Sequence, residues 1–197
     1  MDKLFSLLSS MQSVTRYSDQ SCLKKETVAS HTVNTLFIAS WLLDKLRKEE
    51  AVVINSDEEL LLFKSLLFHD LDEVSMGSIP KPAKHRLSDL RDFIHKAEAS
   101  GVVQLLEEHQ LPLNWLDHWR NGYSGEISII LVVSDFLAAV FKAWQEEIML
   151  GNRFFHAVRK DLQQSLYILR EQRVRLVIAR HIIQMIAASV MVVAVPP

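Results

Sequence analysis

Four residues of this chain have side chains that could bind a divalent metal ion: His31, the adjacent pair His69 and Asp70, and Asp135. Imidazole nitrogens and carboxylate oxygens are ligands that zinc, manganese, cobalt and iron accept. The pair ends an apolar run, and Asp135 lies inside another. Burying such groups without a metal or a partner carries a large desolvation cost. If the four residues converge, the chain is a metal-dependent hydrolase; if they do not, it is an ordinary helical bundle with stray histidines.

Charged residues near these four indicate what the hydrolase would act on. Glu73 follows His69 by four residues and shares its face if the helix extends one more turn. It could position or protonate groups beside a metal, although a solvated acidic patch with Asp72 is the alternative. Arg16 and Lys84 occupy loops next to the ligand segments and suit phosphate, with plain surface charge as the alternative. Because a metal ion offsets charge on phosphoryl oxygens, the pattern favours a phosphorylated substrate.

Helices must position these residues. The 197 residues suit one compact domain, 1–197, and only 5 glycines and 5 prolines argue against an all-β fold. Ser56 and Glu59 predict a capping box at the start of the helix that delivers His69 and Asp70. A loop is expected over 75–82. Helical runs over about 2–14, 28–48, 56–68, 126–150 and 153–188, with a polar helix over about 88–110, predict an all-α domain of about six or more helices.

Composition limits the partners and the compartment. A net charge of −2 offers no general attraction for nucleic acid, so we expect no nucleic-acid partner. The single cysteine, Cys22, suits a reducing compartment, and the start of the chain lacks the apolar core of a secretory signal. The apolar run 182–195 is short for a membrane span and is interrupted by Gln184. We therefore expect a cytoplasmic protein with no membrane partner, whose last helix docks on the core or forms an oligomer interface.

In this order and on these helices, His31, His69, Asp70 and Asp135 resemble the metal-binding set of the HD-domain phosphohydrolases. The resemblance is to the bacterial 5′-deoxynucleotidase branch, and phage-encoded HD enzymes that dephosphorylate dATP are similar too. It covers residues 1 to about 172 and leaves the apolar segment from about 173 outside. It rests on Arg16-Tyr17, Val-Ala-Ser-His31, His69-Asp70-Leu-Asp-Glu73, Gly77-Ser-Ile-Pro80-Lys-Pro82-Ala-Lys84 and Glu146-Glu147-Ile-Met-Leu-Gly151-Asn152.

The resemblance implies a single HD-domain helical bundle and a role for each matching residue. The metal ligands would be His31, His69, Asp70 and Asp135. Glu73, together with Asp70, would act in catalysis by holding or protonating groups around the attacked phosphorus. The implied cofactor is a divalent ion, zinc, cobalt or manganese, with magnesium as an additional candidate.

The substrate contacts are also implied by the resemblance alone. Arg16 and Lys84 would contact phosphate, and the loop at Pro80 would border the sugar and base. Tyr17 stands where the family often has Trp, whose ring packs against the sugar and disfavours a ribose 2′-hydroxyl. Ser78 stands in that loop where bacterial members usually have Asp, so a sugar or phosphate contact there would differ. Val132 likewise replaces a usual Lys.

The resulting hypothesis is a metal-dependent deoxynucleotide phosphohydrolase in which water attacks the α-phosphorus of a purine deoxynucleotide. The leading substrate is dATP, cleaved to deoxyadenosine and triphosphate, with dADP and dAMP as further substrates. The alternative is a 5′-deoxynucleotidase specific for monophosphates. A non-catalytic nucleotide-sensing module is the alternative of another class, and the complete ligand set argues against it. A purely structural protein would leave the His69–Asp70 pair without compensation. The family also suggests a homo-oligomer, a dimer or larger.

Overall fold

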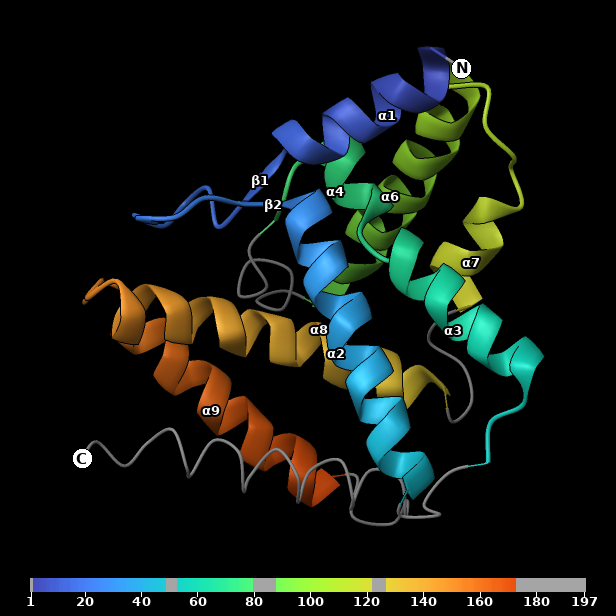
Figure 1. The fold of residues 1–197 in the computed structure, drawn as a ribbon. Helices are drawn as coiled ribbons and strands as arrows, with labels where there is room; N and C mark the ends of the chain where they lie inside the picture. Colours follow the sequence, from blue (N-terminus) through green and yellow to red (C-terminus); the bar gives the residue numbers. More distant parts are fainter. Residues whose placement is uncertain (1, 49–52, 80–87, 122–126, 173–197) are drawn as a thin grey trace.

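The computed structural model describes residues 2–48, 53–79, 88–121 and 127–172, and these form a mostly helical domain (Figure 1). The predicted all-α class is thereby confirmed, apart from two strands of two residues each. The elements are α1 Asp2–Ser13, β1 Thr15–Arg16, β2 Glu26–Thr27, α2 Val28–Lys48, α3 Ser56–Phe68, α4 Leu71–Met76, α6 Ser88–Glu108, α7 Trp115–Asn121, α8 Ile127–Trp144, the π-helix η1 Gln145–Met149 and α9 Phe155–Gln172.

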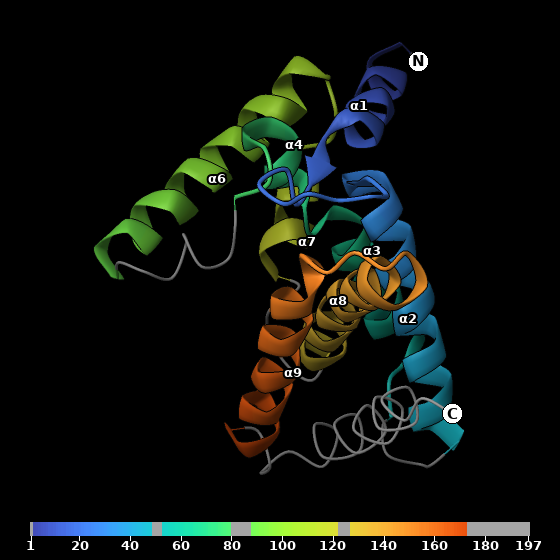
Figure 2. The same cartoon turned by 90° about the vertical axis from the view of Figure 1, so that its left-hand side faces the viewer.

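Helix α8 forms the centre of the larger hydrophobic cluster. Helix α2 crosses it, α3 packs beside both, and α9 lies along its other side (Figures 1 and 2). Within the described residues, Ile127–Met149 is the one stretch long and apolar enough to cross a membrane, but most of it is buried in the domain. A core helix needs that composition because neighbours cover several of its faces. The buried residues of this cluster are Ala39, Leu42, Leu43, Leu46, Leu62, Leu66, Ile127, Ile129, Ile130, Leu131, Val133 and Phe136.

A second hydrophobic cluster joins α1, α4, α6 and α7 to the start of α2 and the end of α3. Helix α2 contributes Val28 to this cluster and Ala39 to the first one, so His31 lies between the two. Helix α3 likewise contributes Phe68 here and Leu66 to the first cluster. Both histidines of the predicted site therefore lie where the two clusters meet, a place that packing on both sides keeps rigid.

The cap of α3 differs from the prediction by one residue. Asn55, rather than Ser56, is the N-cap: its side-chain oxygen accepts hydrogen bonds from the backbone N–H groups of Asp57 and Glu58, each at 3.0 Å. The Glu58 carboxylate accepts in turn from the N–H of Asn55 at 3.0 Å. The predicted capping box is therefore present, but it is formed by Asn55 and Glu58, and α3 begins at Ser56. Asparagine is at least as good an N-cap as serine.

The expected loop over 75–82 also begins later than predicted. Helix α3 ends at Phe68, and α4 starts at Leu71 and continues through Met76. Gly77, at φ +78°, then ends the helix in a conformation that glycine adopts without strain. Pro80 and Lys84 lie outside the described residues, as does the chain after Gln172, where the last predicted helix was expected to continue.

The polar segment before α2 forms a short hairpin that the helical pattern did not predict. Strands β1 and β2 pair antiparallel, with Thr15 opposite Thr27 and Arg16 opposite Glu26. The hairpin projects from the domain beside the end of α8 (Figure 1). It places Arg16 and Glu26 next to each other immediately before the helix that carries His31.

Candidate metal-binding active site

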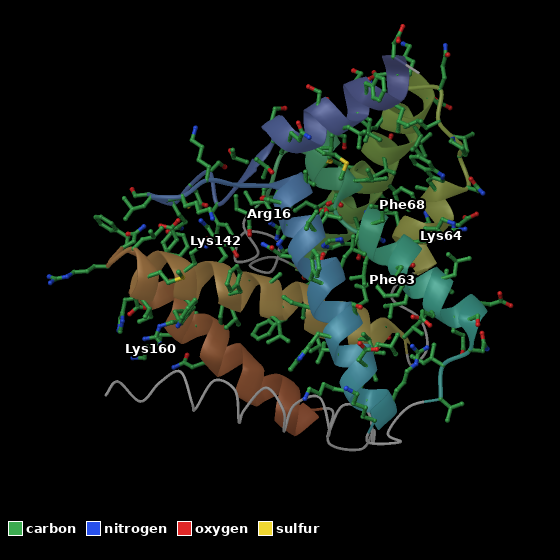
Figure 3. The ribbon with its side chains drawn as sticks, in the orientation of Figure 1. Arg16, Phe63, Lys64, Phe68, Lys142 and Lys160 are labelled. Carbon is green, nitrogen blue, oxygen red and sulfur yellow. The ribbon has the colours of Figure 1, made fainter. Side chains whose placement is uncertain are left out.

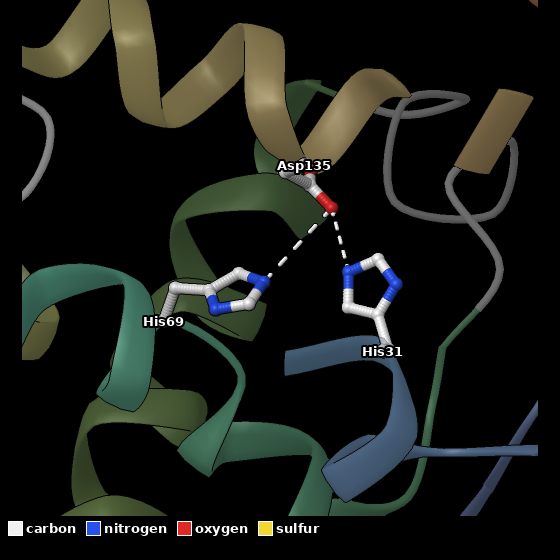
Figure 4. A group of neighbouring side chains, drawn as sticks. All are labelled: His31, His69 and Asp135. Atoms are coloured by element: carbon white, nitrogen blue, oxygen red, sulfur yellow. Dashed lines mark hydrogen bonds and ion pairs between the residues drawn. The ribbon is translucent and has the colours of Figure 1, made fainter. Parts of the chain in front are cut away.

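Three of the four predicted ligands converge from three different helices. His31 comes from the first turn of α2, His69 from the end of α3 and Asp135 from the middle of α8 (Figure 4). Nε2 of His31 lies 3.0 Å from Oδ1 of Asp135, and Nε2 of His69 lies 4.0 Å from the same oxygen. One ligand atom of each residue lies within 4.8 Å of the other two, close enough to share one ion.

The orientation of His69 fits a metal ligand. Its Nδ1 lies 2.7 Å from the carbonyl oxygen of Leu66, so Nδ1 carries the proton and donates it. This leaves the lone pair of Nε2 buried and directed at carboxylate oxygens, Oδ2 of Asp70 at 3.2 Å and Oδ1 of Asp135 at 4.0 Å, which cannot donate a hydrogen bond to it. Nitrogen, nitrogen and oxygen donors suit zinc and neighbouring first-row ions. An orphaned lone pair beside another imidazole and a carboxylate is what such an ion requires.

His31 is fully buried and has a carboxylate facing each of its ring nitrogens. Its Nε2 contacts Asp135, and its Nδ1 lies 3.7 Å from Oε2 of Glu26. Burial lowers the pKa of His31, but the hydrogen bond with Asp135 and the neighbouring carboxylate of Glu26 outweigh that effect and raise the pKa to about 9. Without a metal ion, His31 is therefore protonated at neutral pH, and its positive charge lies between the carboxylates of Asp135 and Glu26.

Asp70, the fourth predicted ligand, lies against both histidines of this cluster. Its Oδ2 is 3.2 Å from Nε2 of His69 and 3.6 Å from Nε2 of His31, while it also accepts a hydrogen bond from Arg16. Burial would raise the pKa of Asp70, but the charges of Arg16 and His69 hold it well below its usual range. Asp70 reaches this position because the chain breaks between α3 and α4 at φ −111°, ψ 24°.

Arg16 connects the metal-binding cluster to Glu73. The guanidinium is buried, with Nη1 donating to Asp70 and, at 3.1 Å, to Oε2 of Glu73. Burial and the neighbouring Asp70 carboxylate raise the pKa of Glu73 to about 7, although Arg16 and a side-chain hydrogen bond with Ser78 oppose the shift. Glu73 is therefore buried beside the cluster and titrates near neutral pH, which suits proton transfer and excludes a solvated patch.

Glu26 is a site residue that the sequence did not reveal. Its carboxylate is buried, and Oε2 lies 3.7 Å from both Nδ1 of His31 and Nε of Arg16. A carboxylate behind a ligating histidine fixes the ring and increases its basicity. Glu26 ends a polar segment with no helical periodicity, so only its distance of five residues from His31 could have drawn attention to it.

Of the other residues predicted to contact the substrate, the structure describes Tyr17 and Ser78. Tyr17 is half-buried and adopts φ +54°, with its ring edge-on to Phe155 at a centroid distance of 5.9 Å. Ser78 forms a side-chain hydrogen bond with Glu73. Pro80 and Lys84 fall outside the described residues, so their predicted contacts stay predictions.

Comparison with known families now adds to this geometry. A family model described as 5′-deoxynucleotidase YfbR-like matches residues 3–185. This chain belongs to the YfbR-like 5′-deoxynucleotidase family. The match extends beyond residue 172, where we expected the resemblance to end. Membership makes the chain an HD-type phosphohydrolase and implies a divalent metal, for which His31, His69 and Asp135 form a possible site.

Curated relatives and solved structures agree with this YfbR-like assignment. A 5′-deoxynucleotidase of Vibrio cholerae is 26% identical over 167 residues, which cover 82% of this chain and 83% of the relative. The 5′-deoxynucleotidase YfbR of Salmonella typhi is 26% identical over 173 residues, 85% of this chain and 84% of the relative. An HD-domain phosphohydrolase of Listeria innocua, 20% identical, superposes with a TM-score of 0.73 over 95% of this chain and 88% of its own. That likeness confirms the HD-domain fold.

Proposed function

We propose that this protein is a 5′-deoxynucleotidase that hydrolyses deoxynucleoside 5′-monophosphates to the deoxynucleoside and inorganic phosphate. The observation that carries the proposal is the convergence of His31, His69 and Asp135, with the buried lone pair of His69 directed into the cluster. The family and the names of the curated relatives support the substrate class. They support the monophosphate alternative better than the dATP triphosphohydrolase that the sequence suggested first.

The ligand set defines the chemistry. A divalent ion held by His31, His69 and Asp135, with Asp70 as fourth ligand, would offset charge on the phosphoryl oxygens and lower the pKa of a bound water molecule. We favour zinc, cobalt or manganese because the donors are two imidazoles and carboxylates, without thiolate. Glu26, which faces Nδ1 of His31, would keep the His31 ring oriented so that Nε2 points to the metal ion.

Glu73 is the proposed proton carrier. Attack of a water oxygen on phosphorus breaks the bond to the 5′-oxygen, which must receive a proton before the deoxynucleoside leaves. A carboxyl group with a pKa of about 7 holds its proton in part of the molecules at neutral pH and can both accept and donate it. Arg16 fixes this carboxylate by the 3.1 Å contact to its Oε2.

Arg16 and Tyr17 are the proposed contacts to the phosphate and the sugar of the nucleotide. Arg16 is charged and adjacent to the cluster, so we propose that it attracts the phosphate as well as holding Asp70 and Glu73. Tyr17, next along the chain, would place its ring against the sugar and select deoxyribose. A purine preference, cytoplasmic location and homo-oligomeric assembly remain proposals on the strength of the family resemblance alone.

Product analysis separates the two phosphate-length hypotheses. Purified protein supplied with manganese, cobalt or zinc would be assayed with a panel of deoxynucleoside mono-, di- and triphosphates, and the products separated by ion-exchange chromatography. We expect inorganic phosphate from the monophosphates and no triphosphate from dATP. Release of triphosphate from dATP, with no activity on dAMP, would overturn the monophosphate proposal in favour of the dATP enzyme.

Substitution of Asp70 tests the site itself. Asp70→Ala should abolish turnover, because it removes a ligand and one of the three carboxylates that face Arg16. Asp117→Ala, on the exposed face of α7, is the matched control and should keep full activity. Unchanged turnover in the Asp70 variant would refute the assignment of this cluster as the active centre.

A further inference from the structure

A second buried charged cluster lies near the hairpin, outside the metal-binding cluster. Lys142 of α8 and Glu146 of η1 are fully buried and pair at 2.6 Å. The two carboxylate oxygens of Glu146 accept the backbone N–H groups of Leu23 at 2.8 Å and Lys24 at 2.9 Å. Lys142 also donates to the carbonyl oxygen of Lys24. Two core side chains thus bind main-chain groups of the segment that joins β1 to β2.

Asn152 completes this cluster. Its Nδ2 lies 2.7 Å from Oε2 of Glu146 and 2.7 Å from the carbonyl oxygen of Ser21. The positive φ of Gly151, +71°, turns the chain back after the π-helix and brings Asn152 beside Glu146. Glu146, Gly151 and Asn152 belong to a motif that the proposed function leaves without a role.

The electrostatics show that these contacts hold a charged carboxylate. Burial would raise the pKa of Glu146, but hydrogen bonds from Lys142, Asn152 and the two backbone N–H groups lower it to about 2. A buried carboxylate with four donors is a strong anchor, because hydrogen bonds to a charged group stabilise more than neutral ones.

The anchored segment leads directly to the proposed substrate contacts. Tyr17 follows Arg16 at the start of the segment, and the ring of Tyr17 packs on the buried ring of Phe155. Nζ of Lys142 lies 5.8 Å from the centroid of the same Phe155 ring. Arg16 and Lys142 both lie where the hairpin meets α8 (Figure 3). The cluster therefore contacts the backbone after Tyr17 and the ring on which Tyr17 rests.

We propose that Lys142, Glu146 and Asn152 are positioning residues that fix the segment 21–24, and through it Arg16 and Tyr17, for binding of the deoxynucleotide. The substrate part of this inference rests on the proposed function. The anchoring part does not, because it concerns the protein alone. The side-chain hydrogen bonds of Lys142 and Glu146 go to each other, to Asn152 and to the segment 21–24, so their effect should fall on substrate binding rather than on metal content.

The sole cysteine of the chain provides a readout that needs neither substrate nor metal. Cys22 lies inside the anchored segment, is half-buried, and its Sγ donates to the carbonyl oxygen of Tyr17 at 3.8 Å. The charges of Lys142 and Glu146 also act on the pKa of the Cys22 thiol, so the rate of reaction with a thiol reagent is compared per thiolate, from its pH dependence in each variant. The rate per thiolate reports local opening of the segment. The test variant is Glu146→Gln. Its side-chain NH₂ group would face a backbone N–H group of Leu23 or Lys24, so that one hydrogen bond to the segment is lost.

Glu147→Gln is the matched control. Glu147 is the next residue and also has a lowered pKa, but it pairs with Arg159 at 2.5 Å and His156 at 2.8 Å on α9, not with the segment 21–24. Asn152→Ala is a milder second variant, because it keeps the Lys142–Glu146 pair. It serves if Glu146→Gln does not fold.

We expect Cys22 of Glu146→Gln to react at least about fivefold faster than in the wild type, because charged hydrogen bonds no longer hold the segment. KM for a deoxynucleoside monophosphate should rise about tenfold because contacts to substrate are lost, with a smaller fall in kcat because Arg16 also holds the Glu73 carboxylate. The preference for deoxyribose over ribose should fall. Asn152→Ala should change in the same direction, and Glu147→Gln should match the wild type in all three measurements.

Unchanged Cys22 reactivity in folded Glu146→Gln or Asn152→Ala would overturn the anchor. Faster reaction with unchanged KM and unchanged sugar preference would overturn the positioning role and leave a purely structural one. If the wild type hydrolyses no deoxynucleoside monophosphate while Cys22 still responds, the anchor stands and the proposed function fails.

Discussion

Arg16 offers the sharpest test of the electrostatics at the site. The guanidinium is buried, and three carboxylates face it: Asp70, Glu73 at 3.1 Å and Glu26 at 3.7 Å. Arg16→Met keeps most of the apolar stem and removes the charge. In metal-free protein the three carboxylates would then be buried without this cation, which is the costly way to break a buried ion pair.

The expected loss in the free energy of unfolding is about 3–5 kcal/mol at pH 7, the range for removing one partner of a buried pair. For a chain of this length, that corresponds to a fall in Tm of about 10 °C. The pKa of Asp70 is depressed in the folded protein, so its contribution is present above the ordinary carboxyl pKa and is lost as the pH falls below it. The difference between wild type and variant should therefore shrink below about pH 4.

Urea unfolding in the presence of a chelator measures this loss. Arg47→Met is the matched control, because Arg47 pairs with Glu59 at 2.6 Å but both side chains are at least about a third exposed. An exposed pair contributes about 1 kcal/mol or less. If Arg16→Met is destabilised by no more than Arg47→Met, Arg16 is not the charge partner of the site, and the reasoning fails.

Three further predictions concern the ion and the dependence of stability on pH. Asp135→Asn should lower the metal bound per chain, measured by plasma mass spectrometry after dialysis, while retaining the helical circular dichroism; full metal content would exclude Asp135 as a ligand. In metal-free protein, burial raises the pKa of Glu73 to about 7, so stability should fall by about 3 kcal/mol as the pH rises from 4.5 to 7. Glu73→Gln should remove that fall in urea titrations, and an identical pH profile would contradict it. Glu146 has its pKa lowered to about 2, so its contribution is present above pH 4.5 and lost toward pH 2. The difference in stability between wild type and Glu146→Gln should accordingly be largest at neutral pH and decline below pH 4.5.

Local patterns in the sequence predicted the helices well. Apolar periodicity predicted the bounds of α1 and α2 nearly to the residue, because each of these helices buries one face and its apolar residues recur at helical spacing. The polar helix expected over 88–110 corresponds to α6. Details that depend on a single cap or turn were less accurate. Asn55 displaced Ser56 as the N-cap, and the polar segment 15–27 formed a hairpin, since two-residue strands have no periodicity to detect.

By itself, the sequence determined which residues can bind a metal: His31, His69, Asp70 and Asp135 are donors in apolar surroundings, and buried donors need a partner. Only the tertiary structure decided how they meet. The crossing of α2 over α8 brings His31 within 3.0 Å of Asp135, 104 residues away, and no local pattern encodes a helix crossing. The same holds for Glu26 and Glu146, whose partners lie on other elements: charge and spacing along the chain do not say which buried groups face each other, because packing in three dimensions sets that.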